Sequence, residues 1–461
     1  MKGVFIKMDA KEYVAGLVEK ARAAQKIVEG FSQEQVDAIC REIAKTVYDN
    51  AEMLAKMAVE ETRMGVYENK VAKNKGKAKV IWNDMKGQKS VGIINRYPEQ
   101  GIIEVAKPMG VVAAITPTTN PIVTPMCNAM FAVKGRNAII VGPHPRSRHC
   151  STKTVELINE RIAKLGAPEN LIQCVEDITM EISGEIMKQS DVVLATGGPG
   201  VVKAAYSSGK PSYGVGAGNV QVIVDKDVDY EKTIPMMIEG RIFDNGIICS
   251  GEQYCICPEE KKDEILAVYK KNRTYICSDK AEVDALRAAM FPGGVMNKDL
   301  VGQSVKAFAD AAGLKVADDC QMILVVPPTY GAGEDFSKEK MGPVQAFYTY
   351  KTWEEGIAIA KANLEVQGAG HSVTIHSNNQ AHIEAAALAL PACRFLINQV
   401  CATNNGGSLL NSLYATTTLG CGSWGGNSIS SNLSWRHLFN VSRIATVRPG
   451  AVAPADDAIW A

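Results

Sequence analysis

A repeated strand-and-helix pattern begins at Gly110-Val-Val-Ala-Ala-Ile115, a short apolar run that ends at the turn residues Thr116 and Pro117. Similar apolar runs follow at 138–141, 170–175, 191–195 and 220–224. Segments with helical spacing lie between them, for example Lys153–Leu165. Continuous apolar strands that alternate with helices indicate a parallel sheet covered on both faces. The sequence therefore predicts an α/β fold whose ligands bind at the carboxyl ends of the strands.

Other segments surround this series. A second series of strands and helices spans 254–419, with strands expected at 322–326, 344–350, 371–375 and 394–398. The region from Asp9 to Asp84 has helical spacing. It includes the lysine-rich run 70–79, for which we expect a mostly solvated face. Apolar stretches at 91–94 and 102–106 predict a hairpin arm, and a short final strand is expected near 444–447.

Length and composition narrow the function. The 461 residues are enough for about three domains and a large core. The 50 basic residues balance the 50 acidic ones, which argues against nucleic acid or an anionic membrane as the main partner. The twelve cysteines lack paired extracellular or zinc-type spacing, so we expect reduced thiols, no metal site and a cytoplasmic location. Nothing resembles a signal peptide or a membrane span.

One thiol is a candidate nucleophile. Cys249 lies in Arg241-Ile-Phe-Asp-Asn-Gly-Ile-Ile-Cys-Ser-Gly-Glu-Gln253, where Ser250 and Gly251 form a small-residue bend. Such a bend can turn a side chain out of an apolar element into a cleft. A free thiol has a pKa near ~8.5 and needs a cation or a helix N-terminus to ionise at neutral pH. By position alone, a buried structural cysteine is the alternative.

Three turns follow strands of the first series. In Thr116-Pro-Thr-Thr-Asn-Pro121, the Asn120 amide can donate to an oxyanion opposite a nucleophile, or it can simply cap a helix. The turn Val141-Gly-Pro-His-Pro-Arg-Ser-Arg148 places cations at a strand end. The cluster Ala195-Thr-Gly-Gly-Pro-Gly200 opens a helix whose backbone amides can face a pyrophosphate.

These segments resemble the aldehyde dehydrogenase superfamily, and specifically its CoA-acylating branch. The stretches that most resemble the CoA-dependent succinate-semialdehyde dehydrogenases of that branch are 64–73, 117–128, 244–253 and 418–425. The resemblance covers almost the whole chain. It implies an aldehyde dehydrogenase fold with N-terminal helices and an NAD(P)-binding domain at 1–90 and 108–234. A catalytic domain at 235–425 and an oligomerisation arm at 91–107 and 426–461 complete the expected division.

The resemblance also implies the catalytic roles. Cys249 would attack the aldehyde and Asn120 would hold the oxyanion, so that an acyl-enzyme passes its acyl group to CoA. His371, in a Gly-x-Gly-His motif, would orient or deprotonate the CoA thiol. Gly214 stands where hydrolytic relatives carry a water-activating glutamate in a Glu-Leu-Gly-Gly motif. Its absence favours transfer to a thiol over hydrolysis.

The expected cofactor is NADP, with NAD as the alternative, and CoA is the co-substrate. His144 takes the ribose-holding place, with Arg146 and Arg148 near a 2′-phosphate. The other residues expected to hold the cofactor are Thr196, Gly197, Gly198, Gly214, Gly216 and Glu339, of which Glu339 would bind the nicotinamide ribose.

Succinate semialdehyde is the expected substrate, with Lys77 and Ser250 reading its carboxylate. Lys77 as one more solvated lysine is the alternative. Acetaldehyde, propanal and sulfoacetaldehyde are the alternative substrates. A hydrolytic aldehyde dehydrogenase, a γ-glutamyl-phosphate reductase and a non-enzymatic scaffold are the alternative functions. The arm predicts a homodimer or a dimer of dimers.

Overall fold

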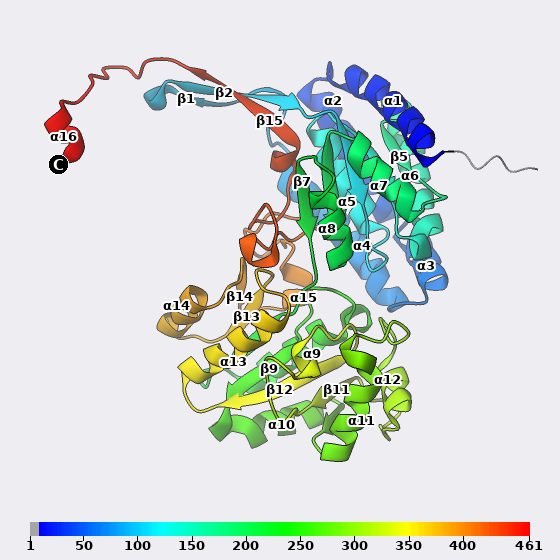
Figure 1. Ribbon diagram of the computed structural model, residues 1–461, viewed down its shortest axis with the longest axis vertical. Coiled ribbons are helices and arrows are strands. Elements are labelled where there is room, and N and C mark those ends of the chain that lie inside the picture. The colour runs from blue at the N-terminus through cyan, green and yellow to red at the C-terminus, as the bar shows by residue number, and fades with distance from the viewer. Residues whose placement is uncertain (1–8) are drawn as a thin grey trace, which may run out of the picture.

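The computed structural model describes residues 9–461, in which two parallel sheets and a small antiparallel sheet organise the helices (Figure 1). The four N-terminal helices are α1 (Ala10–Val28), α2 (Gln33–Asp49), α3 (Ala51–Thr62) and α4 (Tyr67–Met85). A capping box formed by Ser32 and Gln35 starts α2. Among the described residues, no helix is both long enough and apolar enough to cross a bilayer.

The first sheet has five parallel strands in the order β5-β4-β3-β6-β7. Its strands are β3 (Val111–Ile115), β4 (Ala138–Gly142), β5 (Ile172–Cys174), β6 (Val192–Thr196) and β7 (Ser212–Val215). Its helices are α5 (Val123–Lys134), α6 (Arg148–Ile162), α7 (Met180–Gln189) and α8 (Pro199–Tyr206). The strand order reverses between β3 and β6, so their carboxyl ends form the switch point at which such sheets bind ligands.

The second sheet has seven parallel strands in the order β10-β11-β12-β9-β8-β13-β14. Its strands are β8 (Gln221–Val224), β9 (Tyr254–Pro258), β10 (Thr274–Cys277), β11 (Met322–Val325), β12 (Val344–Tyr350), β13 (Val373–His376) and β14 (Phe395–Ile397). Its helices are α9 (Tyr230–Ile242), α10 (Lys262–Lys271), α11 (Lys280–Met290), α12 (Val305–Ala312), α13 (Trp353–Val366), α14 (Gln380–Ala389) and α15 (Cys401–Asn404).

The prediction that the run 220–224 continues the first series is wrong. Strand β8 pairs with β13 and β9 in the second sheet. An apolar run fits the centre of any parallel sheet, so its composition does not tell which sheet it joins. The division into three domains remains a prediction.

The third sheet is antiparallel, in the order β1-β2-β15, and extends away from the rest of the chain (Figure 1). It contains β1 (Gly92–Tyr97), β2 (Ile102–Pro108) and β15 (Phe439–Ala445), and a short helix α16 (Asp456–Trp460) follows. The predicted hairpin is confirmed. The final strand begins at Phe439, five residues before the predicted start at 444, because a half-exposed strand on β2 needs no continuous apolar run.

Candidate active site

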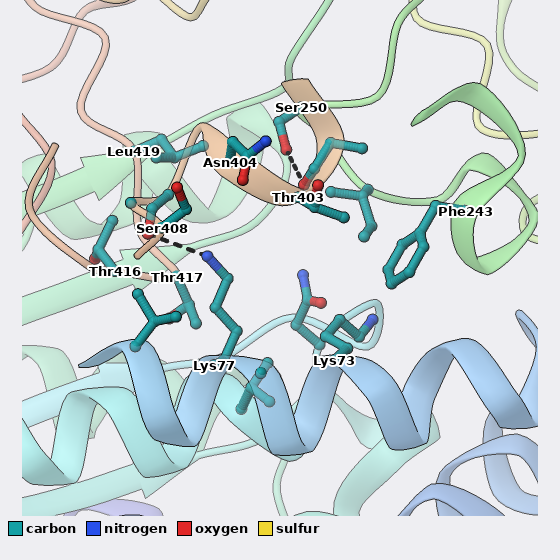
Figure 2. Close-up of a pocket in the computed structure, with 18 of the residues that line it drawn as sticks. Lys73, Lys77, Phe243, Ser250, Thr403, Asn404, Ser408, Thr416, Thr417 and Leu419 are labelled. Carbon is teal, nitrogen blue, oxygen red and sulfur yellow. Dashed lines mark hydrogen bonds between the residues drawn. The ribbon is translucent and has the colours of Figure 1, made fainter. Parts of the chain in front are cut away.

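A cavity of about 270 Å³ lies between α4, the turn after β3 and the loop that carries Cys249 (Figure 2). Its lining includes four residues that the sequence singled out, namely Lys77, Asn120, Cys249 and Ser250. The segments 402–408 and 416–419 close the remaining walls. The fold therefore gathers side chains more than 300 residues apart around one cavity.

Cys249 is partly exposed and packs against Val215, Leu419 and Cys421. Gly218 lies against its backbone so closely that a Cβ there would be 1.9 Å from the Cys249 carbonyl oxygen. Burial raises the pKa of the Cys249 thiol to about 12, the nearby Glu339 adds to that rise, and Arg394 opposes it. At neutral pH the sulfur is therefore mostly a neutral thiol.

Asn120 lies in the turn between β3 and α5, opposite α4. Its backbone carbonyl accepts from the Thr124 amide at 3.2 Å, which joins the turn to the helix start. Its side-chain nitrogen has only a long contact, 3.5 Å, to the Thr119 hydroxyl. The amide is therefore available to donate to an oxygen in the cavity.

Lys77 and Ser250 both line the cavity, and Figure 2 shows them on opposite walls. The Lys77 ammonium donates to the Gly406 carbonyl at 3.1 Å, and burial lowers its pKa to about 8. The Ser250 hydroxyl is buried and donates to the Ala402 carbonyl at 3.1 Å. Lys77 thus has N–H donors left for a ligand in the cavity, whereas the Ser250 hydroxyl proton is already used in its hydrogen bond to Ala402.

The expectation of a solvated lysine face on α4 is wrong. Lys70 and Lys73 both bind the buried Asp244 carboxylate, at 2.9 and 2.6 Å, and their side chains are 3% and 8% exposed. Asp244 sits in the left-handed region, with φ of +54°, and Gly65 lies directly against it. This cluster ties α4 to the nucleophile segment.

Sequence reasoning missed these lysines, although a signal existed. Positions 70, 73 and 77 are spaced i, i+3 and i+7, so they share one helix face. Reasoning also missed Asp244 and Arg394, for which no local pattern stands out.

His371 does not line the cavity. It is fully buried, its Nδ1 lies 3.0 Å from the Ser372 hydroxyl, and its Nε2 has no partner. Burial and the Arg394 charge lower its pKa to about 3, so the ring is neutral. Its role toward CoA remains a prediction.

The cofactor candidates lie at the carboxyl ends of β4 and β6. His144 and Arg146 are exposed, and the Arg146 amide donates to the His144 Nδ1 at 3.1 Å. Arg148 lies 3.8 Å from the Asp177 carboxylate. The Thr196 hydroxyl meets that of Thr418 at 3.0 Å.

The start of α8, after β6, is exposed. Gly198 precedes the helix without a side-chain cap, and the space beside Gly198 and Gly200 is open. Pro199 has no amide N–H and the Val201 amide donates to the Gly198 carbonyl, which leaves the Gly200 amide without a partner within the helix. A free amide at a helix N-terminus is a common anion-binding feature.

Gly214 lies in β7, Gly216 follows that strand directly, and Glu339 lies in the loop before β12. A Cβ at Gly214 would meet Tyr206 and Val202 of α8 at 2.9 Å, so the space beside it is filled. The space beside Gly216 is open. Glu339 is 8% exposed, and burial raises its pKa to about 7 despite the nearby Arg241.

Comparison with known proteins agrees with this geometry. The family model described as aldehyde dehydrogenase family matches residues 5–409. The chain is 52% identical to the succinate-semialdehyde dehydrogenase (acetylating) of Clostridium kluyveri, over 96% of this chain and 98% of that protein. It is 39% identical to the sulfoacetaldehyde dehydrogenase (acylating) of Bilophila wadsworthia, over 93% and 94%.

Among solved structures, an acetylating aldehyde dehydrogenase from Geobacillus thermoglucosidasius superposes with a TM-score of 0.93 at 38% identity, covering 97% of this chain and 98% of that one. The predicted fold class is confirmed by this likeness and by the two parallel sheets. The chain therefore belongs to the aldehyde dehydrogenase family.

Proposed function

We propose that this aldehyde dehydrogenase catalyses the reversible reaction of succinate semialdehyde, CoA and NAD(P)+ to succinyl-CoA and NAD(P)H. The observation that carries the proposal is the composition of the cavity around Cys249. Among residues 9–461, its only charged lining residues are Lys73 and Lys77, both cationic, and no carboxylate lines it. An aldehyde that carries a carboxylate is complementary to the positive charge of these lysines. The similarity to an acetylating succinate-semialdehyde dehydrogenase supports this choice of substrate.

The residues divide the chemistry among them. The Cys249 sulfur attacks the aldehyde carbon, and the Asn120 amide donates to the oxyanion of the thiohemiacetal. The bound nicotinamide cofactor supplies the acceptor for the hydride. The CoA sulfur then attacks the acyl carbon of the Cys249 thioester, the oxyanion again meets Asn120, and Cys249 leaves as a thiolate.

The surroundings of Gly214 support transfer to CoA rather than to water. The Tyr206 hydroxyl accepts from the Gly214 amide at 3.0 Å and from the Ser428 amide at 2.9 Å, so α8 fills the space beside this glycine. A glutamate here would displace Tyr206 and point at α8, whereas Val215, the next residue, packs on Cys249. A carboxylate at 214 would therefore point away from the thiol. The β7 side chain that contacts Cys249 is Val215, which is apolar and cannot activate water.

For the cofactor we propose NADP, held by His144, Arg146 and Arg148 on the adenosine side and by Thr196, Gly197 and Gly198 at the pyrophosphate. Arg146 is exposed and forms no ion pair among the described residues, so its guanidinium is available to a 2′-phosphate. Glu339 is proposed to bind the nicotinamide ribose. The open space beside Gly216 leaves room for the cofactor near the thiol.

A homodimer is proposed on the arm. Strands β1 and β15 are the two edges of its sheet, and Ile93, Tyr97 and Ile444 are exposed on them. An unpaired strand edge is a site at which a second chain can add.

Alternative substrates differ in charge and length. Acetaldehyde and propanal carry no anion for Lys77, and sulfoacetaldehyde carries one on a shorter chain. The test follows NADPH and NADH oxidation with succinyl-CoA, acetyl-CoA, propionyl-CoA and butyryl-CoA in parallel. We expect succinyl-CoA to give the highest kcat/KM, with NADPH preferred.

A variant pair sharpens the test. Lys77→Ala should lower kcat/KM for succinyl-CoA by roughly 10- to 100-fold while leaving butyryl-CoA within about twofold. Lys79→Ala, an exposed lysine on the same helix, is the matched control and should change neither. Equal losses for both thioesters would rule out carboxylate recognition by Lys77, and a lack of reaction with every acyl-CoA would rule out the acylating chemistry.

A further inference from the structure

Arg394, immediately before β14, is a buried guanidinium that the mechanism above does not use. It is 4% exposed. Its donors bind the carbonyl oxygens of His371 and Gly420 at 2.6 and 2.7 Å. Longer contacts reach the Ser372 hydroxyl at 3.3 Å and the Asn432 side-chain oxygen at 3.4 Å. All four partners are neutral oxygens.

The charge of Arg394 is not neutralised by a carboxylate. Within residues 9–461, no Asp or Glu lies close enough to it to form an ion pair, whereas Lys70 and Lys73 share Asp244 and Arg287 binds Glu334. A buried charge without a counter-charge is costly, so its retention needs a reason. The ionisable groups on which the Arg394 charge acts include His371 and four thiols, of Cys421, Cys393, Cys249 and Cys401.

A short chain of contacts connects Arg394 to the nucleophile. The Gly420 carbonyl that it binds precedes Cys421, and Cys421 packs beside Cys249 in one small apolar cluster. The backbone at Gly370 holds Cys421 in place, since a Cβ there would lie 1.8 Å from the Cys421 oxygen. The guanidinium and the nucleophilic sulfur are thus fixed on the same rigid framework.

We propose that Arg394 is a positioning residue that supplies the counter-charge for the Cys249 thiolate. The inference rests on the proposed function in one respect, that Cys249 is the nucleophile. The thiolate is the reactive form of a cysteine, and a nearby cation is one of the few features that stabilise it in a buried site. On ionisation the thiol proton passes to water, and the negative sulfur then neutralises a guanidinium that lacks a carboxylate.

Other groups around Cys249 set the background for this effect. Glu339 is near enough to disfavour the thiolate, and so is Cys421 when it ionises. The thiol of Cys401 and the amine of Lys77 also interact with Cys249. Lys77 already donates to Gly406 and faces the substrate cavity, so Arg394 is the cation on the side of the thiol cluster.

The test measures the thiol itself. The full-length enzyme without substrate is treated with iodoacetamide across pH, and alkylation of the peptide containing Cys249 is quantified by mass spectrometry. For Arg394→Gln we expect alkylation of Cys249 to slow about tenfold at each pH between about 7 and 9, below the midpoint of the curve, which corresponds to a rise of about one unit in the pKa of the thiol. Arg394→Lys keeps the charge and should stay within about threefold of the wild type.

Arg136→Gln is the matched control, because Arg136 is also buried and donates to two carbonyl oxygens, of Glu29 and Ala106, away from the thiols. It should lower stability without moving the alkylation curve. A folded Arg394→Gln variant with the wild-type curve would overturn the proposal. If Arg394→Gln does not fold, Arg394→Lys decides the question. A folded lysine variant in which alkylation of Cys249 is also about tenfold slower would show that the hydrogen bonds of the guanidinium matter and its charge does not, which would overturn the proposal. Because alkylation needs no turnover, its outcome is separate from the acyl-CoA assays that test the function.

Discussion

Two regions of the molecule, the carboxyl ends of β4 and β6 and the surroundings of Cys249, hold their candidate functional residues in opposite ways. At the ends of β4 and β6, the cofactor candidates His144, Arg146 and Gly198 are exposed and make few contacts. Between the sheets, the residues around Cys249 are buried and tightly held, as the Lys70, Lys73 and Asp244 cluster illustrates. A cofactor that leaves after each turnover suits an open strand end. A covalent intermediate needs fixed geometry and exclusion of water.

The same contrast applies to charge. Exposed cations are screened by water and salt, so each contributes little to binding. Buried cations act at close range in a low dielectric, and the loss of one is felt strongly. We therefore expect substitutions near the Cys249 sulfur to have the largest effects on activity, and substitutions of the exposed residues at the ends of β4 and β6 to have the smallest.

The largest effect is expected for Cys249→Ser. Replacement of the nucleophile should reduce kcat by about 10³-fold or more, because a serine hydroxyl stays protonated at neutral pH and no carboxylate or histidine among the described residues lines the cavity to activate it. Steady-state acyl-CoA reduction measures the loss. Cys320→Ser, at a partly exposed thiol ahead of β11, is the control and should keep full activity. An active Cys249→Ser enzyme would remove the basis of the mechanism.

The next largest effect is expected for Asn120→Ala. Loss of one oxyanion donor should lower kcat about 10²-fold, with a much smaller change in KM, because the donor acts chiefly on the developing charge. Asn404→Ala changes an amide in the wall of the same cavity and should cost less than about threefold. A similar loss in both variants would mean that the cavity shape, and not the amide at 120, governs the rate.

The sequence predicted the outline well where local pattern is strong. Four strands of the second sheet, β11 to β14, were predicted within two residues of their bounds, because apolar runs bounded by turns mark buried parallel strands. Strands β7 and β10 were missed, since Ser212–Val215 and Thr274–Cys277 are short and polar at one end. The sheet to which β8 belongs depends on the path of the chain, which composition does not record.

The site was predicted in part for the same reason. Cys249 and Asn120 stand in turns after regular elements, and their motifs are visible in the sequence. Asp244 became visible only once the fold brought α4 against the nucleophile segment, and Arg394 only once β14 lay near the loop at Gly420. Burial and distant pairing define these residues, and neither is encoded in the neighbouring sequence.

A smaller effect should come from the ionisation of Lys77. Its pKa is lowered to about 8 in the folded chain, below the unfolded value of 10.5. Between these values the unfolded chain binds more protons, so Lys77 makes stability rise as pH increases from about 8 to 10.5. The contribution is on the order of 2 kcal/mol. Lys77→Met should remove it.

Denaturant unfolding at pH 8 and pH 10 checks this sign. The free energy of unfolding of the wild type should increase relative to that of Lys77→Met as the pH rises. Burial favours the neutral amine of Lys77, whereas a bound substrate carboxylate should favour the charged ammonium. The KM for succinyl-CoA should therefore increase above pH 8, and that for butyryl-CoA should not. Parallel pH profiles for the two thioesters would show that Lys77 does not meet the carboxylate.

The smallest effect is expected at the exposed rim, for Arg146→Gln. An exposed guanidinium that binds a 2′-phosphate should favour NADPH over NADH by roughly 3- to 10-fold. The variant should lose that preference because its KM for NADPH increases, while kcat and the KM for NADH stay unchanged. Arg148→Gln should matter less, because Arg148 lies beside Asp177 and its charge is partly compensated. Added salt should weaken the wild-type preference as well, since both partners are exposed to solvent. If the preference for NADPH survives both substitutions and high salt, the exposed arginines do not determine cofactor choice. The buried residues around Cys249 would then determine it, and the difference between the exposed and the buried region would not extend to cofactor specificity.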